Sequence, residues 1–279
     1  MENAILQLIR QNELARLGMG TWNMGDKPKE EDGEIAALQH GLDLGMKIID
    51  TAEMYGEGRS EKLVGKAIQS RREEVYLISK VLPNNASYEG VQNACNRSLK
   101  NLDTDYLDLY LLHWQGHYPF QETIDAFEEL KAKGRIKDWG VSNMDVKEMD
   151  EIIHCEGGTH CQTNQVLYNL TRRGIEYDLL PWQHSNKMPV MAYSPIEQGR
   201  LLSSPVLLEL GEKHKASAAQ IALAWVLRDS LVIPIPKTSN SNRVEENFNS
   251  LKINLDEEDL IKLDKVFQAP LFKMALQTI

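Results

Sequence analysis

The stretch KIIDTAEMYGEGRSEKLVG, residues 47–65, shows most clearly which kind of fold this chain adopts. It begins with a short apolar run that ends on a carboxylate, Asp50, and five residues later Tyr55 stands in a loop that contains glycine. A short, nearly continuous apolar run is typical of a strand that is covered on both faces. The stretch therefore predicts one unit of an α/β fold with polar side chains at its carboxyl end.

Similar apolar runs recur along all 279 residues. They predict eight strands, at Arg16–Gly20, Lys47–Asp50, Val75–Lys80, Leu107–His113, Ile136–Ser142, Gln162–Gln165, Pro189–Tyr193 and Val232–Pro236. Between them lie segments with the apolar spacing of helices, such as Glu31–Leu44 and Glu122–Lys133. Gly134 suits a C-terminal cap of the second segment, and Ser217 suits the N-cap of a later helix. Eight β/α units in about 250 residues predict a single (β/α)₈ TIM barrel domain spanning residues 1–279.

The rival α/β fold is a doubly wound sheet that binds a dinucleotide at a G-x-G-x-x-G turn between its first strand and a helix. The nearest match in this sequence is GMGTWN, residues 18–23. It lacks the third glycine and leads into the polar stretch 25–32 rather than into a helix. We therefore reject the doubly wound fold.

Composition excludes several classes of partner. The net charge of −10 argues against a nucleic acid or an anionic membrane as partner, and no apolar run approaches the roughly 20 residues that span a bilayer. The N-terminal sequence lacks the apolar core of a signal peptide, and three cysteines suit reduced thiols, so we expect a cytoplasmic protein. The pairs His154-Cys155 and His160-Cys161 do not have a zinc-site spacing, and we expect no metal.

The polar residues that end the predicted strands are the candidates for chemistry. They are Asp50, Lys80, His113 with Trp114, Ser142 with Asn143, Gln165, Tyr193 with Ser194, and Lys237 with Thr238 and Ser239. Singly, such residues usually bond to turn backbones. Barrel enzymes, however, carry their active sites at the carboxyl ends of the strands, so we expect these side chains to meet at one mouth.

Tyr55 is the candidate proton donor of this set. A free tyrosine has a pKa of about 10, and an adjacent ammonium such as Lys80 stabilises the phenolate and lowers that pKa. Asp50 would compensate the buried charge of Lys80 and orient it. His113 could donate a hydrogen bond to a substrate oxygen or relay a proton. These four side chains predict a site that moves a proton to or from an oxygen of a small molecule.

A cationic site is predicted between the end of the last predicted strand and the start of the helix that follows it. Lys237 and Arg243 lie six residues apart, across a predicted helix start in SNSNRVEEN. Two cations together with helix-terminal N–H groups suit a phosphate group. An acidic protein needs such a local site if it is to bind an anionic cofactor.

Taken together, these motifs resemble the aldo-keto reductase superfamily. The resemblance is carried by DTAEMYG, Lys80, LLHW, GVSN, TNQ, AYSP and IPKTSNSNRVEEN, in this order, and runs from about Leu17 to Asp264. Within the superfamily the sequence is similar to a bacterial subgroup of methylglyoxal and general aldehyde reductases with DTAEMYG and NQVLYN signatures.

The resemblance implies an NADPH-dependent carbonyl reductase with the tetrad Asp50, Tyr55, Lys80 and His113. It implies that Tyr55 supplies the proton, that the nicotinamide supplies the hydride, and that Trp22 and Trp114 help to wall the substrate pocket. The residues it implies for cofactor binding are Gly20, Thr21, Trp22, Asp50, Ser142, Asn143, Gln165, Tyr193, Ser194, Ile196, Gly199, Lys237, Thr238, Ser239, Arg243, Glu246 and Asn247.

The sequence departs from this family at its end. Only the short tail FQAPLFKMALQTI follows the last predicted helix, so we expect a more open outer pocket that suits small reactive aldehydes and α-dicarbonyls better than steroids. Two other functions stay open: a cofactor-binding sensor or regulatory subunit without catalysis, and a barrel isomerase or aldolase that uses Lys80 as a Schiff-base nucleophile. Nothing in the sequence requires an interface, so we expect a monomer.

Overall fold

The computed structural model describes residues 3–11 and 16–279. Its eight strands form one sheet in sequence order, and every neighbouring pair is parallel. They are β1 (Met19–Gly20), β2 (Ile48–Asp50), β3 (Tyr76–Val81), β4 (Leu107–Leu112), β5 (Ile136–Ser142), β6 (Asn164–Leu167), β7 (Val190–Tyr193) and β8 (Val232–Pro234). All eight predicted strands are present, with ends shifted by up to three residues.

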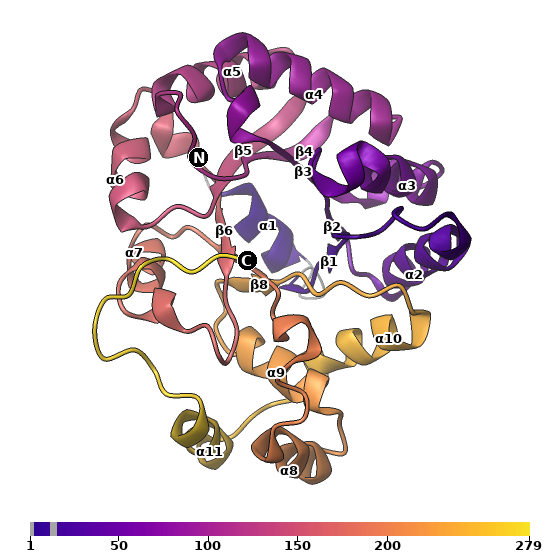
Figure 1. Cartoon of the computed structure of the whole chain (residues 1–279), viewed down its shortest axis with the longest axis vertical. Helices are drawn as coiled ribbons and strands as arrows, with labels where there is room; N and C mark the ends of the chain where they lie inside the picture. Colours follow the sequence, from indigo (N-terminus) through magenta and orange to yellow (C-terminus); the bar gives the residue numbers. More distant parts are fainter. Residues whose placement is uncertain (1–2, 12–15) are drawn as a thin grey trace.

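Backbone hydrogen bonds close this sheet into a ring. The N–H of Gly18 donates to the carbonyl oxygen of Pro234 at 3.0 Å, and the N–H of Gly20 donates to that of Pro236 at 3.1 Å. These bonds join the first strand of the chain to the last. The fold is therefore the predicted (β/α)₈ barrel, seen along its axis in Figure 1.

Helices surround the ring of strands. They are α2 (Glu31–Leu44), α3 (Arg59–Ile68), α4 (Tyr88–Leu102), α5 (Phe120–Ala132), α6 (Val146–His154), α7 (Leu179–Ser185), α8 (Pro205–His214), α9 (Ala218–Leu227), α10 (Ser241–Asn249) and α11 (Glu257–Val266). Ser217 caps α9 in a capping box with Gln220, and Gly134 has the left-handed φ of 68° expected just beyond the end of α5. The bounds predicted for α2 are those observed.

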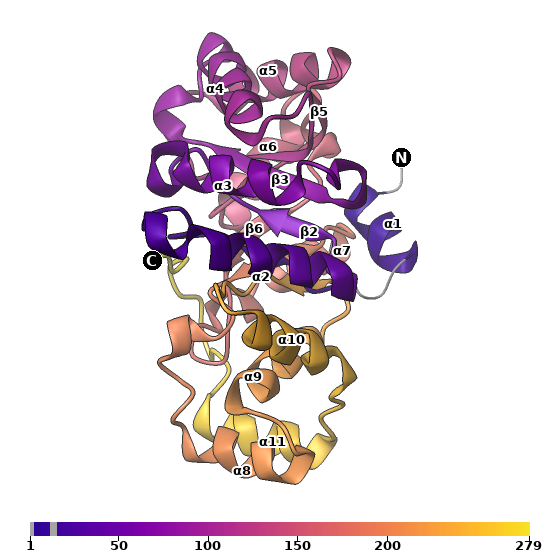
Figure 2. The ribbon, with the colours of Figure 1, turned by 90° about the vertical axis from the view of Figure 1, so that its right-hand side faces the viewer.

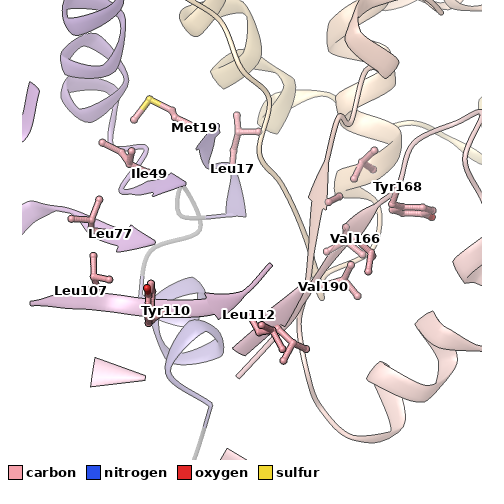
Figure 3. Close-up of a cluster of buried hydrophobic side chains, with 14 of the residues drawn as sticks. Leu17, Met19, Ile49, Leu77, Leu107, Tyr110, Leu112, Val166, Tyr168 and Val190 are labelled. Carbon is pink, nitrogen blue, oxygen red and sulfur yellow. The ribbon is translucent and has the colours of Figure 1, made fainter. Parts of the chain in front are cut away.

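Apolar side chains alternate between the two sides of the strands. Along β3 and β4, Ile78, Leu109 and Leu111 belong to a cluster inside the ring, whereas Leu77 and Tyr110 pack in the larger layer between strands and helices. Figure 3 shows part of that outer layer. Both faces of each strand are thus covered, which explains the continuous apolar runs in the sequence.

The two ends of the barrel differ in character. One end is covered by α1 (Ala4–Gln11), whose Ile5 and Ile9 are buried in the inner cluster. Figure 2 shows α1 at the end opposite to the C-terminus of the chain. The other end carries the carboxyl ends of the strands, where the polar candidates lie. Across residues 3–11 and 16–279, none of the helices combines the length and the apolar composition needed to cross a bilayer.

Candidate active site

Lys80 is the centre of the polar cluster at the carboxyl ends of the strands. Its side chain is fully buried, and its ammonium donates to Asp50 Oδ2 at 2.7 Å, to the carbonyl oxygen of Thr51 at 2.8 Å and to Tyr55 Oη at 3.2 Å. An ammonium has three protons, so each one has a protein acceptor. The structure therefore brings together the aspartate, the lysine and the tyrosine that the sequence analysis selected.

Strand register and loop conformation explain how these residues meet. Asp50 ends β2, Lys80 lies near the end of the neighbouring β3, and β2 and β3 pair in parallel with Asp50 opposite Ile78. Tyr55 then begins a tight turn in which Gly56 and Gly58 have φ values of 57° and 84°, a left-handed conformation that glycine adopts without strain. This turn brings the phenol back over the strand ends.

A buried chain of hydroxyl groups supports the loop from beneath. Thr51 Oγ1 donates to Ser60 Oγ at 3.2 Å, Ser60 Oγ lies 2.8 Å from Thr21 Oγ1, and Thr21 Oγ1 donates to the carbonyl oxygen of Asp50 at 2.9 Å. All three hydroxyl-bearing residues are fully buried. They tie the loops after β1 and β2 to the start of α3, which fixes the direction from which Tyr55 approaches the site.

The pKa of Tyr55 corrects one prediction. The position of Lys80 in the sequence predicts a pKa of Tyr55 below its usual value. Burial raises the pKa of Tyr55, Lys80 lowers it and Asp50 raises it, with the net result that it lies above 10. Burial also works against the charge of Lys80, but contact with Asp50 and Tyr55 raises the pKa of this lysine above its usual value. The site therefore holds a neutral phenol beside a protonated lysine at neutral pH.

His113 lies beside Tyr55 as a neutral imidazole. Burial and the charge of Lys80 lower the pKa of His113 to about 3, so it does not relay a proton as a cation near pH 7. Its Nδ1 is buried and has no hydrogen-bond partner among the described residues. Because a buried N–H without an acceptor costs more than an unused lone pair, the proton is favoured on Nε2. The ring packs edge-on to Tyr55, with centroids 5.9 Å apart.

Gln165 has a contact that the sequence analysis did not foresee. Its Nε2 donates to Asp50 Oδ1 at 2.8 Å, so the carboxylate that holds Lys80 is also bonded to a side chain of β6. Gln165 lines the cavity, and its Oε1 has no donor among the described residues. The bond to Asp50 thus fixes the orientation of the amide and leaves an acceptor for a ligand N–H. The strand ends in the sequence predict that Asp50 and Gln165 share one barrel mouth, but not that they touch.

Asn143, Ser142 and Tyr193 form a second network. Asn143 Nδ2 donates to the carbonyl oxygen of His113 and to Ser142 Oγ, both at 3.1 Å, and Tyr193 Oη donates to Asn143 Oδ1 at 2.8 Å. Ser142 Oγ in turn donates to the carbonyl oxygen of Gln165 at 2.8 Å. Asn143 therefore has to exchange one of these bonds before it can donate to a ligand carboxamide.

A long cavity of about 1120 Å³ runs from this cluster to the start of α10. Its lining includes all but two of the predicted site residues: Gly20, Thr21, Trp22, Asp50, Tyr55, His113, Trp114, Ser142, Asn143, Gln165, Tyr193, Ser194, Ile196, Gly199, Lys237, Thr238, Arg243, Glu246 and Asn247. The exceptions are Lys80, which is covered by its partners, and Ser239. The sequence thus predicted most of the cavity wall.

Two cations stand at the far end of this cavity. Lys237 Nζ donates to Ser239 Oγ at 2.8 Å, and neither Lys237 nor Arg243 forms an ion pair with a carboxylate within the described ranges. Ser239 Oγ also donates to the buried Glu34 at 3.2 Å, and Ser239 is not among the described residues that line the cavity. The unpaired charges of Lys237 and Arg243 form a site that suits a phosphate.

The C-terminal tail corrects a second prediction. The short tail in the sequence predicts an open outer pocket. Residues 268–279 instead double back from α11, and Figure 1 shows the C-terminus over the middle of the ring. Lys273 is paired with Asp145 and Asp178, and Thr278 and Ile279 line the cavity. The tail therefore closes part of the mouth, which tail length alone could not reveal.

The remaining candidates have structural roles. His154 Nδ1 lies 2.6 Å from the carbonyl oxygen of Asp150, and His160 Nδ1 lies 3.0 Å from Glu128 Oε1, so the two rings contact different partners. Nowhere in the described part of the chain do three or more His, Cys, Asp or Glu side chains gather in a way that could hold a metal ion. Trp139 and Trp225 are buried and pack in the interior.

Several lining residues were missed by the sequence analysis. They are Asn23, Met54, Gln115, Pro195, Gln198, Leu202, Ser217, Ala218, Ala219, Ile235, Pro236, Thr278 and Ile279. Most of them lie in loops that follow the strand ends, so extending each strand-end motif by a few residues would have found Asn23, Gln115 and Gln198. The start of α9 and the tail reach the cavity only through tertiary packing.

The closed barrel and the buried Asp–Lys–Tyr cluster beside a long cavity define a barrel enzyme. The model of the aldo/keto reductase family matches residues 16–268, and the chain belongs to this family.

Two curated relatives and one solved structure illustrate the similarity. The methylglyoxal reductase YeaE of Escherichia coli is 48% identical over the full length of both chains. The glyoxal reductase of Bacillus subtilis is 33% identical and covers 90% of this chain and 88% of its own. The structure of an aldo-keto reductase from Klebsiella pneumoniae in complex with NADPH has a TM-score of 0.94 and 45% identity, with 95% of each chain covered.

Proposed function

We propose that this chain is an NADPH-dependent reductase of aldehydes and activated ketones, with methylglyoxal-type α-dicarbonyls and aromatic aldehydes as its substrates. The observation that carries the proposal is the 3.2 Å contact between Tyr55 and the fully buried Lys80 at the wall of the large cavity. The names of the E. coli and B. subtilis relatives, a methylglyoxal reductase and a glyoxal reductase, support the substrate class.

The residues of the cavity suit NADPH. Lys237 and Arg243 provide unpaired cations for the 2′-phosphate at one end, with Thr238, Glu246 and Asn247 beside them. Gln165 Oε1 is a free acceptor for the carboxamide at the other end, where Ser142, Asn143 and Tyr193 also lie. Ser194, Ile196 and Gly199 form the wall between the two ends, where the pyrophosphate would be held. The NADPH complex of the Klebsiella relative supports this assignment.

The chemistry divides between the cofactor and the protein. When bound, NADPH supplies the hydride that reduces the carbonyl carbon. Tyr55 Oη gives its proton to the carbonyl oxygen, and Lys80, which already donates to Oη, stabilises the phenolate that remains. Asp50 keeps Lys80 charged and in place. The high pKa of Tyr55 ensures that the phenol carries its proton at neutral pH, before the substrate arrives.

His113 and the aromatic walls position the substrate. The Nε2–H of His113 donates to the same carbonyl oxygen, which polarises the carbonyl bond while the imidazole stays neutral. Trp114 packs against His113 with ring centroids 4.8 Å apart, and Trp22 lines the cavity as well. Lining side chains such as Trp22, Met54 and Trp114 are uncharged, so the substrate end suits an uncharged carbonyl compound rather than an anionic keto acid.

The two alternative functions receive less support. A Schiff-base lysine must be unprotonated and open to substrate, whereas Lys80 is fully buried, donates three hydrogen bonds and has a raised pKa. A sensor that only binds the cofactor has no need for a buried Lys80 next to Tyr55. Catalysis by Tyr55 is the function that uses both residues.

Three further assignments complete the proposal. We take residues 1–279 to be one domain, because the closed barrel includes strands from both ends of the sequence. We take the chain to work as a monomer, since the whole site is built from a single chain. A cytoplasmic location is consistent with free thiols at Cys95, Cys155 and Cys161.

A substrate panel tests the proposed function. Purified protein is assayed with NADPH and with NADH against methylglyoxal, an aromatic aldehyde, an unactivated short aldehyde, a sugar and a steroid ketone. We expect efficient reduction of the first two with NADPH and a high KM for the unactivated aldehyde. A preference for the sugar or the steroid would overturn the substrate class, and cofactor binding without any turnover would favour the sensor.

A further inference from the structure

The loop after β7 has an unusual backbone. Ser194, Glu197 and Gln198 have φ values of 47°, 47° and 55°, although none of them is a glycine. Residues with side chains keep this left-handed conformation only when their surroundings hold them in it. Ser194 and Gln198 belong to the segment 194–199 that lines the cavity, whereas Glu197 points away from it.

Glu197 is the point at which this loop is held. It is 6% exposed, and its carboxylate accepts hydrogen bonds from Asn169 Nδ2 at 2.8 Å and from Arg172 Nη2 at 3.0 Å. Asn169 Nδ2 also donates to the carbonyl oxygen of Ser194 at 2.9 Å. One asparagine thus bonds to two of the three strained residues.

The partners of Glu197 come from a second loop, the one after β6. A tight turn, in which the N–H of Arg172 donates to the carbonyl oxygen of Asn169 at 3.0 Å, brings both side chains to the same side. Asn169 Oδ1 accepts from the N–H and the hydroxyl of Thr171, each at 2.9 Å, which fixes the direction of its amide. Asn169, Arg172 and Glu197 are absent from the cavity lining, so they would not touch a ligand there.

We propose that Asn169 and Arg172 are positioning residues that act through Glu197 to hold the segment 194–199 in the shape that binds the cofactor. This inference rests on the proposed function, because it assumes that the segment contacts NADPH. The contacts to Glu197 lower its pKa although burial alone would raise it, so the carboxylate stays ionised and keeps both partners. Without them the strained residues would relax, and the segment would have to be reordered each time the cofactor binds.

Arg172 is the best position for a test. Its side chain is 35% exposed, so replacement leaves no buried cavity, and Arg172→Met removes the charge while it keeps much of the apolar stem. Arg172→Lys restores the charge without the fork that bonds to the carboxylate. Glu209→Gln is the control, because it breaks a surface ion pair with Lys262, at 2.8 Å, that belongs to α8 and α11 rather than to the cavity.

The measurements are the Kd for NADPH, kcat at saturating NADPH, KM for the aldehyde, and thermal stability. Loss of a hydrogen bond to a charged group changes an equilibrium constant, here the Kd for NADPH, by a factor of about 10 to 150. We expect Arg172→Met to raise the Kd for NADPH by about 10-fold or more, Arg172→Lys to raise it less, and Glu209→Gln to leave it unchanged. The kcat and the KM for the aldehyde should stay near the wild-type values, because the tetrad and the substrate end are untouched.

The outcomes separate this inference from the proposed function. If the wild-type protein binds NADPH and Arg172→Met binds it equally well, the positioning role is wrong while the proposed function stands. A KM for the aldehyde that rises together with the Kd would also overturn the inference, because Arg172 lines a small hollow with Leu276 and Gln277 and would then act through the tail. If Arg172→Met is unstable, Glu197→Gln gives the same comparison. A wild-type protein that binds no NADPH would overturn both proposals.

Discussion

Replacement of Asp50 by asparagine should damage both the stability and the chemistry of the site. Asp50 is 2% exposed and is the only carboxylate paired with the fully buried ammonium of Lys80 within the described residues. Removing one partner of a buried ion pair costs about 3–5 kcal/mol of folding free energy, because an uncompensated charge remains. We therefore expect Asp50→Asn to lower the free energy of unfolding by roughly that amount.

The second bond of Asp50 makes the substitution worse. Asp50 accepts from Lys80 on Oδ2 and from Gln165 on Oδ1, whereas asparagine has a single acceptor oxygen. The new NH₂ group must face either the ammonium of Lys80 or the amide of Gln165. If it faces Lys80, the ammonium loses the acceptor that Asp50 provided. If it faces Gln165, the Gln165 amide must rotate so that Oε1 accepts from the asparagine, and Nε2 then faces the cavity in place of Oε1. The kcat should fall by at least about 10²-fold, since the raised pKa of Lys80 depends on Asp50.

A double variant separates charge burial from catalysis. In Asp50→Asn/Lys80→Met the buried charge is absent, so we expect at least half of the lost unfolding free energy to return, with no return of activity. Denaturant unfolding and steady-state kinetics are measured on the wild type, the single variant and the double variant. An Asp50→Asn protein of unchanged stability, or a double variant less stable than the single one, would refute the reasoning.

Two other predictions concern the cofactor and the histidine. Arg243→Ala should weaken NADPH binding by roughly 10- to 150-fold and leave NADH binding nearly unchanged, because only NADPH carries the 2′-phosphate. Titrations of the variant with each cofactor measure this, and an equal loss of affinity for NADPH and NADH would contradict it. The pKa of His113 is about 3 in the folded protein and about 6.5 in the unfolded chain. As the pH falls, the unfolded chain therefore takes up the histidine proton before the folded protein does, and the free energy of unfolding decreases below about pH 6.5. The wild type should lose about 2 kcal/mol more than His113→Gln between pH 7 and pH 5 in denaturant unfolding, and parallel losses would show that His113 is not buried as a neutral base.

The fold was largely predictable because barrel strands carry their own signal. Buried parallel strands are apolar on both faces, so β2, β3 and β4 can be recognised as short apolar runs in the sequence. The polar residue at or just before the end of each run marks the carboxyl end of the strand. That residue type, together with the rule that strand ends share one mouth, predicted that Asp50, Lys80 and Tyr55 meet. The order of the strands in the ring followed from the same alternation of strands and helices.

What could not be predicted depends on contacts between distant loops. The bond from Gln165 to Asp50 spans 115 residues, and the path of the tail depends on the pairing of Lys273 with Asp145 and Asp178. The direction of the Tyr55 pKa shift was wrong because a sequence identifies a neighbouring charge but not the degree of burial, and here burial outweighs Lys80. The bond from Ser239 to Glu34 could not be predicted either, because the two residues lie 205 positions apart in the sequence.

The central claim is that Tyr55 gives the proton in carbonyl reduction, and Tyr55→Phe tests it most directly. Phenylalanine keeps the ring that packs against His113 but removes the hydroxyl to which Lys80 donates. The measurement is the turnover of methylglyoxal with NADPH, together with the Kd for NADPH on the same samples. We expect kcat to fall by about 10²–10⁴-fold while the Kd stays within about twofold of the wild type. A Tyr55→Phe protein that reduces methylglyoxal at a near-native rate would contradict the assignment.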